Sequence, residues 1–262
     1  MQTIKVIVCG ARGRMGREVI SLIQKEEDYE LVGAIESPTH PEIGQEIFKG
    51  IRVTSSLKNV LQRDAVIVEF TNPPATLEHL RIARENHIPM VIGTTGFKKL
   101  ELDEIRNSSQ KIPVLLSPNM SLGINLLFVL VREVATVLGD FDKEIVEAHH
   151  RLKQDSPSGT ARKIAEILAE VEGKDLSQVA LYGRKGITRG RKKDEIGIHS
   201  IRGGTIVGDH TVIFAGEGER LEITHRAESR VIFARGALIG ARFLIKKDKG
   251  LYDLQDVLGI KK

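Results

Sequence analysis

One short segment of the sequence contains most of the residue types needed to move a proton and to hold an anion. It covers residues 147–160 and reads Glu-Ala-His-His-Arg-Leu-Lys-Gln-Asp-Ser-Pro-Ser-Gly-Thr. The imidazoles of His149 and His150 exchange protons near neutral pH, and Lys153 is a charged donor whose acidity burial can tune. The segment ends at a predicted helix start, whose N–H groups suit a carboxylate or a phosphate; it comprises Ser158, Gly159 and Thr160. These residues predict a pocket for a small dianion that must receive a proton.

The two histidines are adjacent, which limits what they can do together. Successive side chains of a strand point to opposite faces, so we expect His149 to share a face with Glu147 and Arg151, and His150 to lie on the other face. A metal site would need both imidazoles and a third ligand to converge, so the sequence predicts no metal here. An ordinary pair of surface or core histidines is the alternative. The nearby Lys153 and the adjoining helix start favour the functional interpretation.

A glycine-rich turn near the N-terminus provides a second chemical signal. It lies between a predicted strand and a predicted helix and consists of Gly10, Ala11, Arg12, Gly13, Arg14, Met15 and Gly16. Glycine lets the backbone turn tightly and approach a pyrophosphate, which then binds the helix N–H groups. The spacing departs from the usual G-x-G-x-x-G, but Glu36, at the end of the second predicted strand, adds a carboxylate for a ribose diol. A dinucleotide site is therefore predicted, with a turn that binds no ligand as the alternative.

The residues near Glu36 also bear on the choice of cofactor. A carboxylate repels the additional phosphate of NADP, and the next residue is Ser37 rather than a cation. Arg12 and Arg14 lie close in sequence and remain able to contact a phosphate. The sequence therefore predicts NADH as the preferred cofactor, or dual use of NADH and NADPH.

Two later turns follow predicted strands at the carboxyl edge of the same sheet, where open α/β sheets bind their ligands. Small and hydroxyl residues there are suited to admit a nicotinamide ring and to hydrogen-bond it. Either turn alone is more often an ordinary connection. The residues are Gly93, Thr94, Thr95, Gly96, Ser117, Pro118, Asn119 and Met120.

The order of apolar runs predicts an α/β protein with two domains. The first half alternates short apolar runs with amphipathic stretches, which is typical of βαβ units and a parallel sheet. Later runs follow one another without helices between them, which predicts a second α+β domain built on a mixed sheet. Strands are expected over 4–8, 31–35, 51–53, 65–70, 90–92, 114–116, 144–150, 196–201, 205–215 and 221–226, and helices from about 13, from 75, and over about 122–138 and 160–170.

Composition restricts the functional classes further. The 262 residues are 41% hydrophobic and include a single cysteine, Cys9, which excludes an intrachain disulfide. No apolar run reaches the ~18 residues of a membrane span, and no signal peptide is recognisable, so a cytoplasmic protein is expected. The formal net charge is +4, and the densest basic stretch lies at Arg184–Lys193. It has no aromatic residues to stack on bases, so we interpret it as a solvated loop rather than a nucleic-acid arm. A mobile loop that attracts an anionic substrate is a third interpretation.

Taken together, these motifs resemble those of the dihydrodipicolinate reductase family, also called 4-hydroxy-tetrahydrodipicolinate reductases, of lysine and diaminopimelate synthesis. The resemblance extends over essentially the whole chain. The His-His segment is highly specific for this family, and the glycine turn is not. The matching residues are 10–16, 93–97, 147–151, 153, 156–161 and 218–225.

The resemblance implies a fold, an activity and roles for particular residues. Residues 1–121 and 231–262 would form a Rossmann-type dinucleotide-binding domain, and residues 122–230 a domain that binds the cyclic imine dicarboxylate and forms a homotetramer. His149 matches the family's proton donor/acceptor and Lys153 its second proton donor. His150 matches a substrate contact, and Gly159 with Thr160, beside Ser158, the carboxylate-binding residues. NAD(P)H contacts match Gly10 to Met15, Glu36, Gly93 to Thr95, and Ser117 to Met120.

Two other functions remain open from the residues alone. A two-domain dehydrogenase acting on an amino-acid semialdehyde or a sugar would share the glycine turn but would not require the His-His segment. A redox-sensing regulator would bind the dinucleotide and contact nucleic acid through the basic loop, although the sequence shows no recognisable helix-turn-helix or zinc module.

Overall fold

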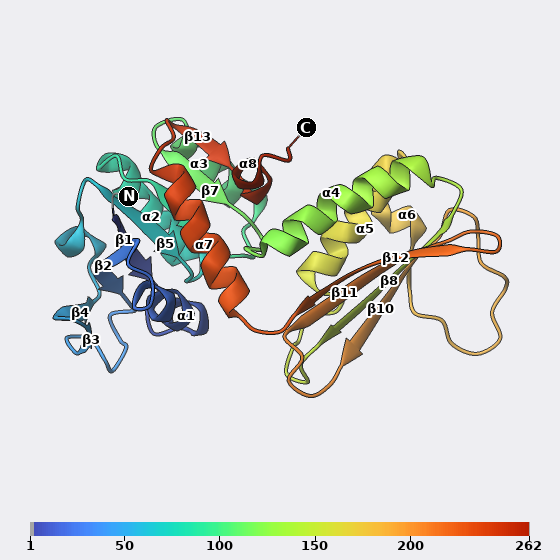
Figure 1. Cartoon of the computed structure of the whole chain (residues 1–262), viewed down its shortest axis with the longest axis horizontal. Helices are drawn as coiled ribbons and strands as arrows, with labels where there is room; N and C mark the ends of the chain where they lie inside the picture. The colour runs from blue at the N-terminus through green and yellow to red at the C-terminus, as the bar shows by residue number, and fades with distance from the viewer. Residues whose placement is uncertain (1–2, 262) are drawn as a thin grey trace. The chain divides into compact units, whose positions relative to one another are not determined.

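The structure, a computed structural model, describes residues 3–261 and divides into two compact units. The first comprises Met1–Leu122 together with Arg230–Lys262, and the second Gly123–Ser229. Each unit has its own sheet and its own hydrophobic core (Figure 1). No helix within residues 3–261 combines the length and the hydropathy that crossing a bilayer requires.

Among the described residues, the first unit is built on an eight-stranded sheet. Neighbouring strands are parallel, except that β3 is antiparallel to β4. The chain order reverses at β1, with β2 on one side and β5 on the other, and such a switch point is where doubly wound sheets bind ligands. In sheet order the strands are β13 (Gly250–Tyr252), β7 (Pro113–Leu116), β6 (Met90–Ile92), β5 (Ala65–Glu69), β1 (Ile4–Cys9), β2 (Tyr29–Ile35), β4 (Ile51–Thr54) and β3 (Glu46–Phe48).

The central strands of this sheet are apolar on both faces because helices cover both. Every residue of β5 is buried, as is typical of parallel strands inside an α/β sheet. The two hydrophobic clusters of the unit each draw on alternate residues of β1, which shows that they occupy opposite faces. The helical segments are α1 (Arg14–Ile23), α2 (Pro73–Glu85), α3 (Lys99–Ser109), α7 (Val231–Leu244), α8 (Leu254–Leu258) and the 3₁₀ turn η1 (Leu57–Val60).

Helix α7 returns to the first unit after the second unit is complete. It packs beside α1 and across β5, β6 and β7, as the orange helix in Figure 1 shows. Small residues allow a close approach, because a Cβ on Gly236 would lie 1.8 Å from the carbonyl oxygen of Met120. The family resemblance assigned residues 231–262 to this domain, but the sequence analysis did not identify α3, β3, β9, β13, α6 or α8.

The second unit is a mixed five-stranded sheet covered on one face by α4 and α5 (Figure 1). β8 lies at its centre, parallel to β10 and antiparallel to β11, which confirms the predicted mixed sheet. The elements are α4 (Leu122–Val137), β8 (Asp142–His149), α5 (Gly159–Val171), α6 (Leu176–Val179), β9 (Ala180–Tyr182), β10 (Ile196–Arg202), β11 (Gly208–Ala215) and β12 (Arg220–Ala227).

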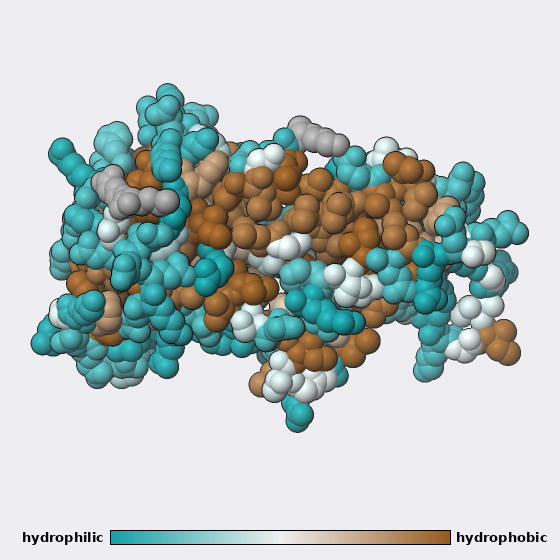
Figure 2. All heavy atoms as spheres, viewed as in Figure 1, coloured by the Kyte–Doolittle hydropathy of each residue, from teal (hydrophilic) through white to brown (hydrophobic). Residues whose placement is uncertain are grey.

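Helix α4 keeps an apolar face that its own unit does not cover. Ile124, Leu127 and Val131 are buried in the core, whereas Leu126 and Leu130 are 44% and 41% exposed. Figure 2 shows hydrophobic residues gathered over this helix. Contiguous exposed apolar surface of this kind is typical of contact sites.

The close contact of α7 with the Met120 carbonyl makes a stability prediction. We expect Gly236→Ala to lower the free energy of unfolding by about 1–3 kcal/mol, because a backbone oxygen cannot yield to the added methyl. Gly240→Ala on the same helix is the matched control. Its Cβ would lie nearest to Leu115 Cδ1, at 3.0 Å, and 3.8 Å from Leu115 Cδ2 and Val91 Cγ1. All three are side-chain tips, which can shift. Equal unfolding midpoints for the two variants in urea would contradict this account of the packing.

Candidate active site

The turn after β1 has the geometry that a pyrophosphate requires. Gly10 adopts a φ of +78°, and a Cβ on it would lie 2.4 Å from the carbonyl oxygen of Phe70. A Cβ on Gly16 would lie 2.1 Å from the Gly10 carbonyl oxygen. Gly13 precedes α1, whose first turn contains no acidic residue. The first N–H groups of a helix have no intrahelical acceptor and attract anions, so these residues fit the phosphates of a dinucleotide.

The carboxylate of Glu36 is held in a fixed orientation just beyond the end of β2. Its Oε2 accepts a hydrogen bond from the backbone N–H of Arg12 at 2.9 Å, and its Oε1 from that of Ser37 at 2.9 Å. Each carboxylate oxygen has a further lone pair, so Glu36 can still accept from a ribose diol. The predicted partnership between the glycine turn and Glu36 is thus a direct contact in the fold.

The later turns lie at the carboxyl edge, but some of their side chains face inward. The Thr94 hydroxyl oxygen accepts a hydrogen bond from the backbone N–H of Thr71 at 3.1 Å. It also lies 2.9 Å from the hydroxyl oxygen of Thr76. The Ser117 hydroxyl donates to the Asn119 carbonyl at 2.7 Å. Thr94, Ser117 and Met120 are buried, whereas Thr95 is exposed. Internal bonds therefore occupy two of the hydroxyls that the sequence had suggested for cofactor contact.

Below these turns lies a buried ion pair that the sequence did not suggest. Glu69 Oε2 is 2.8 Å from His79 Nδ1, and Thr71 and Thr76 donate to Glu69 Oε1. Burial lowers the pKa of His79, but the hydrogen bond and the charge of Glu69 outweigh burial, so that its net pKa is raised. The Cys9 sulfur brings three possible metal ligands within 4.8 Å of one another. The hydrogen bonds to Glu69 already account for this cluster without a metal.

In the second unit, the segment of residues 147–160 begins at the end of β8. Burial alternates along this strand, and Glu147 and His149 both lie on its buried face. His149 and Glu147 therefore share a face, as the sequence predicted. The register places Ser200 of β10 and His210 of β11 on either side of Glu147, and Arg202 beside His149.

The fully buried Glu147 carboxylate organises the groups around it. Arg202 Nη1 and Nη2 donate to its two oxygens at 2.9 and 2.8 Å, and the Ser158 N–H donates at 3.2 Å. His149 Nδ1 lies 2.5 Å from Oε2. Burial raises the pKa of Glu147, but the hydrogen bonds from His149, Arg202 and Ser200 outweigh it and hold the pKa well below its ordinary value. The ionised Glu147 carboxylate accepts a hydrogen bond from His149 Nδ1–H, which leaves Nε2 for proton exchange.

A second histidine, His210, lies against His149. The two rings are in edge contact, with centroids 5.2 Å apart. His210 Nε2 is 3.1 Å from the hydroxyl of Ser158, which caps α5 by accepting from the Ala161 N–H at 3.2 Å. Burial, together with the charge of His149, lowers the pKa of His210 to about 3. His210 is thus a neutral imidazole at ordinary pH and adds no charge beside His149.

The remaining predicted residues surround the same strand end. Lys153 Nζ forms an ion pair with Asp155 Oδ1 at 2.9 Å, and its side chain is 21% exposed. Gly159 and Thr160 are the first residues of α5, whose first turn also contains no acidic residue. His150 follows His149 and is partly exposed. The sequence did not suggest Arg202 or His210, because only the register of β10 and β11 brings them to Glu147.

The basic loop is tied to carboxylates of its own unit. Arg184 donates to both oxygens of Glu144 and to Glu195, and Arg191 pairs with Asp142 at 2.7 Å and with Glu144 at 3.2 Å. Burial raises the pKa of Glu144, but hydrogen bonds from Arg184, His199 and Arg191 outweigh burial and lower it to about 2. These contacts favour a structural role for two of the cations over a nucleic-acid arm.

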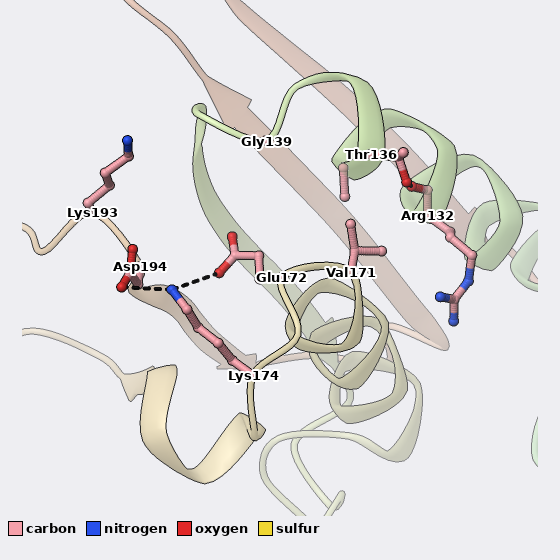
Figure 3. Close-up of a pocket in the computed structure, with 9 residues that line it drawn as sticks. Arg132, Thr136, Gly139, Val171, Glu172, Lys174, Lys193 and Asp194 are labelled. Atoms are coloured by element: carbon pink, nitrogen blue, oxygen red, sulfur yellow. Dashed lines mark hydrogen bonds and ion pairs between the residues drawn. The ribbon is translucent and has the colours of Figure 1, made fainter.

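A polar cavity of about 550 Å³ near the other end of the sheet contains none of the predicted site residues (Figure 3). Its lysines face acidic partners. Lys174 lies 2.7 Å from Asp194 and 3.8 Å from Glu172, and Lys193 lies 3.0 Å from Asp140. Arg132, the third cation of the lining, pairs with Glu170 at 2.7 Å. Because each of the three cations has a carboxylate partner, the cavity does not resemble a site for a dianion.

Two family domains together match almost the whole chain. "Dihydrodipicolinate reductase, N-terminus" matches residues 4–120, and "Dihydrodipicolinate reductase, C-terminus" matches residues 123–258. The chain belongs to the dihydrodipicolinate reductase family. This confirms the resemblance stated from the sequence. Membership makes the chain an oxidoreductase of a family that uses a nicotinamide cofactor.

Individual relatives agree over their full lengths. A 4-hydroxy-tetrahydrodipicolinate reductase from Syntrophus aciditrophicus (strain SB) is 47% identical over 266 residues, covering 98% of this chain and 99% of the relative. One from Aquifex aeolicus (strain VF5) is 49% identical over 269 residues, covering 98% and 100%. The dipicolinate-bound dihydrodipicolinate reductase from Paenisporosarcina sp. TG-14 matches in structure with a TM-score of 0.79 at 27% identity, covering 96% and 98%.

The buried neutral His210 makes a prediction about pH. Between pH 6.5 and about 3 the unfolded chain binds a proton at this residue that the folded chain does not. Stability therefore falls as pH falls through this window, by at most about 1.4 kcal/mol per pH unit from this residue. We expect His210→Asn to flatten the curve of unfolding free energy between pH 6.5 and 4.5. His87→Asn, at an exposed turn position, is the control. Parallel curves for wild type and His210→Asn would refute the assignment.

Proposed function

We propose that this chain catalyses the NAD(P)H-dependent reduction of 4-hydroxy-tetrahydrodipicolinate, through dihydrodipicolinate, to tetrahydrodipicolinate. The single observation that supports the assignment most directly is the buried Glu147–His149 pair at the end of β8, which the Ser158 N–H joins to the start of α5. It places a proton donor beside a helix N-terminus suited to a carboxylate. The names of the relatives at 47% and 49% identity support the same substrate.

In this proposal the protein supplies protons and holds two acid groups. The bound nicotinamide supplies a hydride to an electron-poor ring carbon. A proton must neutralise the negative charge that develops on the ring. His149 donates this proton from Nε2, while its Nδ1–H remains hydrogen-bonded to Glu147. The helix start at Gly159 and Thr160 binds one substrate carboxylate. The 4-hydroxyl leaves as water when dihydrodipicolinate forms, and the hydride and one proton then add to the ring. The products are tetrahydrodipicolinate, water and the oxidised nucleotide.

Lys153 is proposed as the second proton donor. Its ammonium is held by Asp155, whose pKa burial raises but Lys153 lowers more, so that the carboxylate stays ionised. This ion pair holds the ammonium of Lys153 within the segment that follows His149. The side chain is partly exposed, so solvent can return a proton to the amine after each turnover.

The proton-donor roles lead to a kinetic prediction. We expect His149→Gln or Lys153→Ala to lower kcat by about 10²–10⁴-fold, the usual contribution of general acid catalysis. Lys163→Ala, on the exposed surface of α5, is the control for loss of a lysine charge. Turnover is followed by NADH oxidation, with substrate formed in situ by dihydrodipicolinate synthase. Wild-type kcat in both variants would remove these residues from the mechanism.

The helix start leads to a different kinetic signature. Thr160→Val removes one hydroxyl near the proposed carboxylate, so we expect KM for the dicarboxylate to rise about tenfold, the effect of a lost charged hydrogen bond. The KM for NADH should stay unchanged. A fall in kcat with unchanged KM would argue that Thr160 acts on chemistry rather than on binding.

We further propose NADH as the preferred cofactor or dual use of NADH and NADPH. The fixed carboxylate of Glu36, followed by Ser37, supports this choice. Both stand at positions where binding of the additional phosphate of NADP would be favoured by a cation. A homotetramer is also proposed, supported by the exposed apolar face of α4. Sedimentation equilibrium of the whole chain measures the oligomeric state directly.

A further inference from the structure

Arg12 has two features that the proposed cofactor contacts do not explain. Its Nη2 lies 2.7 Å from Glu42 Oε2, and its side chain is only 17% exposed. Its Nε is buried and, among the described residues, has no hydrogen-bond partner. The backbone N–H of Arg12 binds Glu36. Arg12 therefore contacts Glu36, the predicted ribose ligand, through its backbone. Its guanidinium still has donors that are not used.

Glu42 is held firmly enough to restrain that guanidinium. It belongs to the loop between β2 and β3, where its backbone N–H donates to His40 Nδ1 at 3.2 Å and its carbonyl accepts from Gln45. The loop is fixed in turn to β4, because the Gly44 N–H donates to the Val53 carbonyl at 2.8 Å. Arg17 approaches the same carboxylate only at 3.8 Å. Arg12 is thus the principal partner of Glu42.

NADP differs from NAD by a phosphate on the 2′-hydroxyl of the adenine ribose. Such a dianion would be repelled by Glu36 and would need a cation at the same place. Arginine is the side chain best suited to phosphate, because its planar fork presents several donors. Glu42 forms an ion pair with Arg12 and so competes with a phosphate for its guanidinium. Its carboxylate is also a second negative charge, after that of Glu36, in this part of the site.

We propose that Glu42 determines cofactor specificity in this chain, by holding Arg12 and so weakening recognition of a 2′-phosphate. The inference rests on the proposed cofactor site and extends it to a residue outside the glycine turn. Arg12 is the cation that would accept the phosphate, and Glu42 is the competitor for it. Discrimination then arises from an opposing charge as well as from the Glu36 contact.

Binding of two small nucleotides tests the proposal without turnover. Adenosine 2′,5′-bisphosphate and 5′-AMP differ by the 2′-phosphate alone, and calorimetry gives the Kd of each. We expect Glu42→Gln to lower the Kd of the bisphosphate by about fivefold to tenfold relative to the Kd of 5′-AMP. This is the effect of removing one charge several ångströms away in a partly solvated site. Glu30→Gln, an exposed carboxylate on β2, should change this ratio less than twofold.

Arg12 provides the complementary variants. Arg12→Gln should weaken binding of the bisphosphate relative to 5′-AMP. In the Arg12→Gln/Glu42→Gln double variant the Glu42 effect should be reduced, because only the direct repulsion between Glu42 and the phosphate remains to be removed. The ratio of kcat/KM for NADPH to kcat/KM for NADH should rise in variants that bind the bisphosphate more tightly relative to 5′-AMP. It should fall in variants that bind the bisphosphate more weakly. Unfolding midpoints identify any variant that has lost its fold.

Three results would overturn the inference. Unchanged Kd values for both nucleotides in Glu42→Gln would show that Glu42 does not oppose the phosphate. An equal change for both nucleotides would show that the ion pair only supports the loop. A full Glu42 effect in the absence of Arg12 would show that Arg12 is not the cation involved. Failure of the wild type to bind either nucleotide or NADH would instead refute the proposed cofactor site, and the inference with it.

Discussion

The buried charge of Glu147 is the constraint on which the second unit depends. A carboxylate removed from water costs several kcal/mol unless cations and donors surround it. Here the donors come from β10, from the start of α5 and from His149, so satisfying one charge fixes three elements at one point. The same bonds orient the imidazole. Stability of this part of the fold and orientation of the proposed acid therefore have one physical cause.

The first unit differs from the second in its electrostatics. In our proposal it binds the phosphates of a dinucleotide at its surface, whereas the second unit buries a carboxylate of its own. Its glycines bring the backbone close enough for N–H groups to act, and the absence of acids in the first turn of α1 leaves their partial charge available. Glu36 and Glu42 then add negative charge at the edge of the same site. In our proposal, the balance between the backbone donors, Arg12 and these two carboxylates determines which nucleotide binds.

Much of this organisation could be read from the sequence, because it depends on local patterns. The parallel strands are apolar on both faces, the glycine turn has a steric signature, and the alternation along β8 placed Glu147 beside His149. Partners such as Arg202 and His210 could not be inferred, since they lie more than fifty residues away and only the strand register brings them in. Helix α3 was missed because Leu102 and Ile105 are too few to define an apolar stripe. The inward orientation of Thr94 and Ser117 also depends on tertiary contacts, because both hydroxyls are bonded within the fold.

The placement of α7 has a consequence for synthesis of the chain on the ribosome. This helix supplies Ala234, Ala237, Leu238 and Ala241 to the core of the first unit, yet it is translated after the whole of the second. Until then one face of the nascent nucleotide-binding sheet is covered by α1 without α7 and exposes apolar surface. The second unit is continuous in sequence and can complete its core first. The order of maturation is thus the reverse of the order of the motifs, and the N-terminal glycine turn becomes part of a finished domain only at the end.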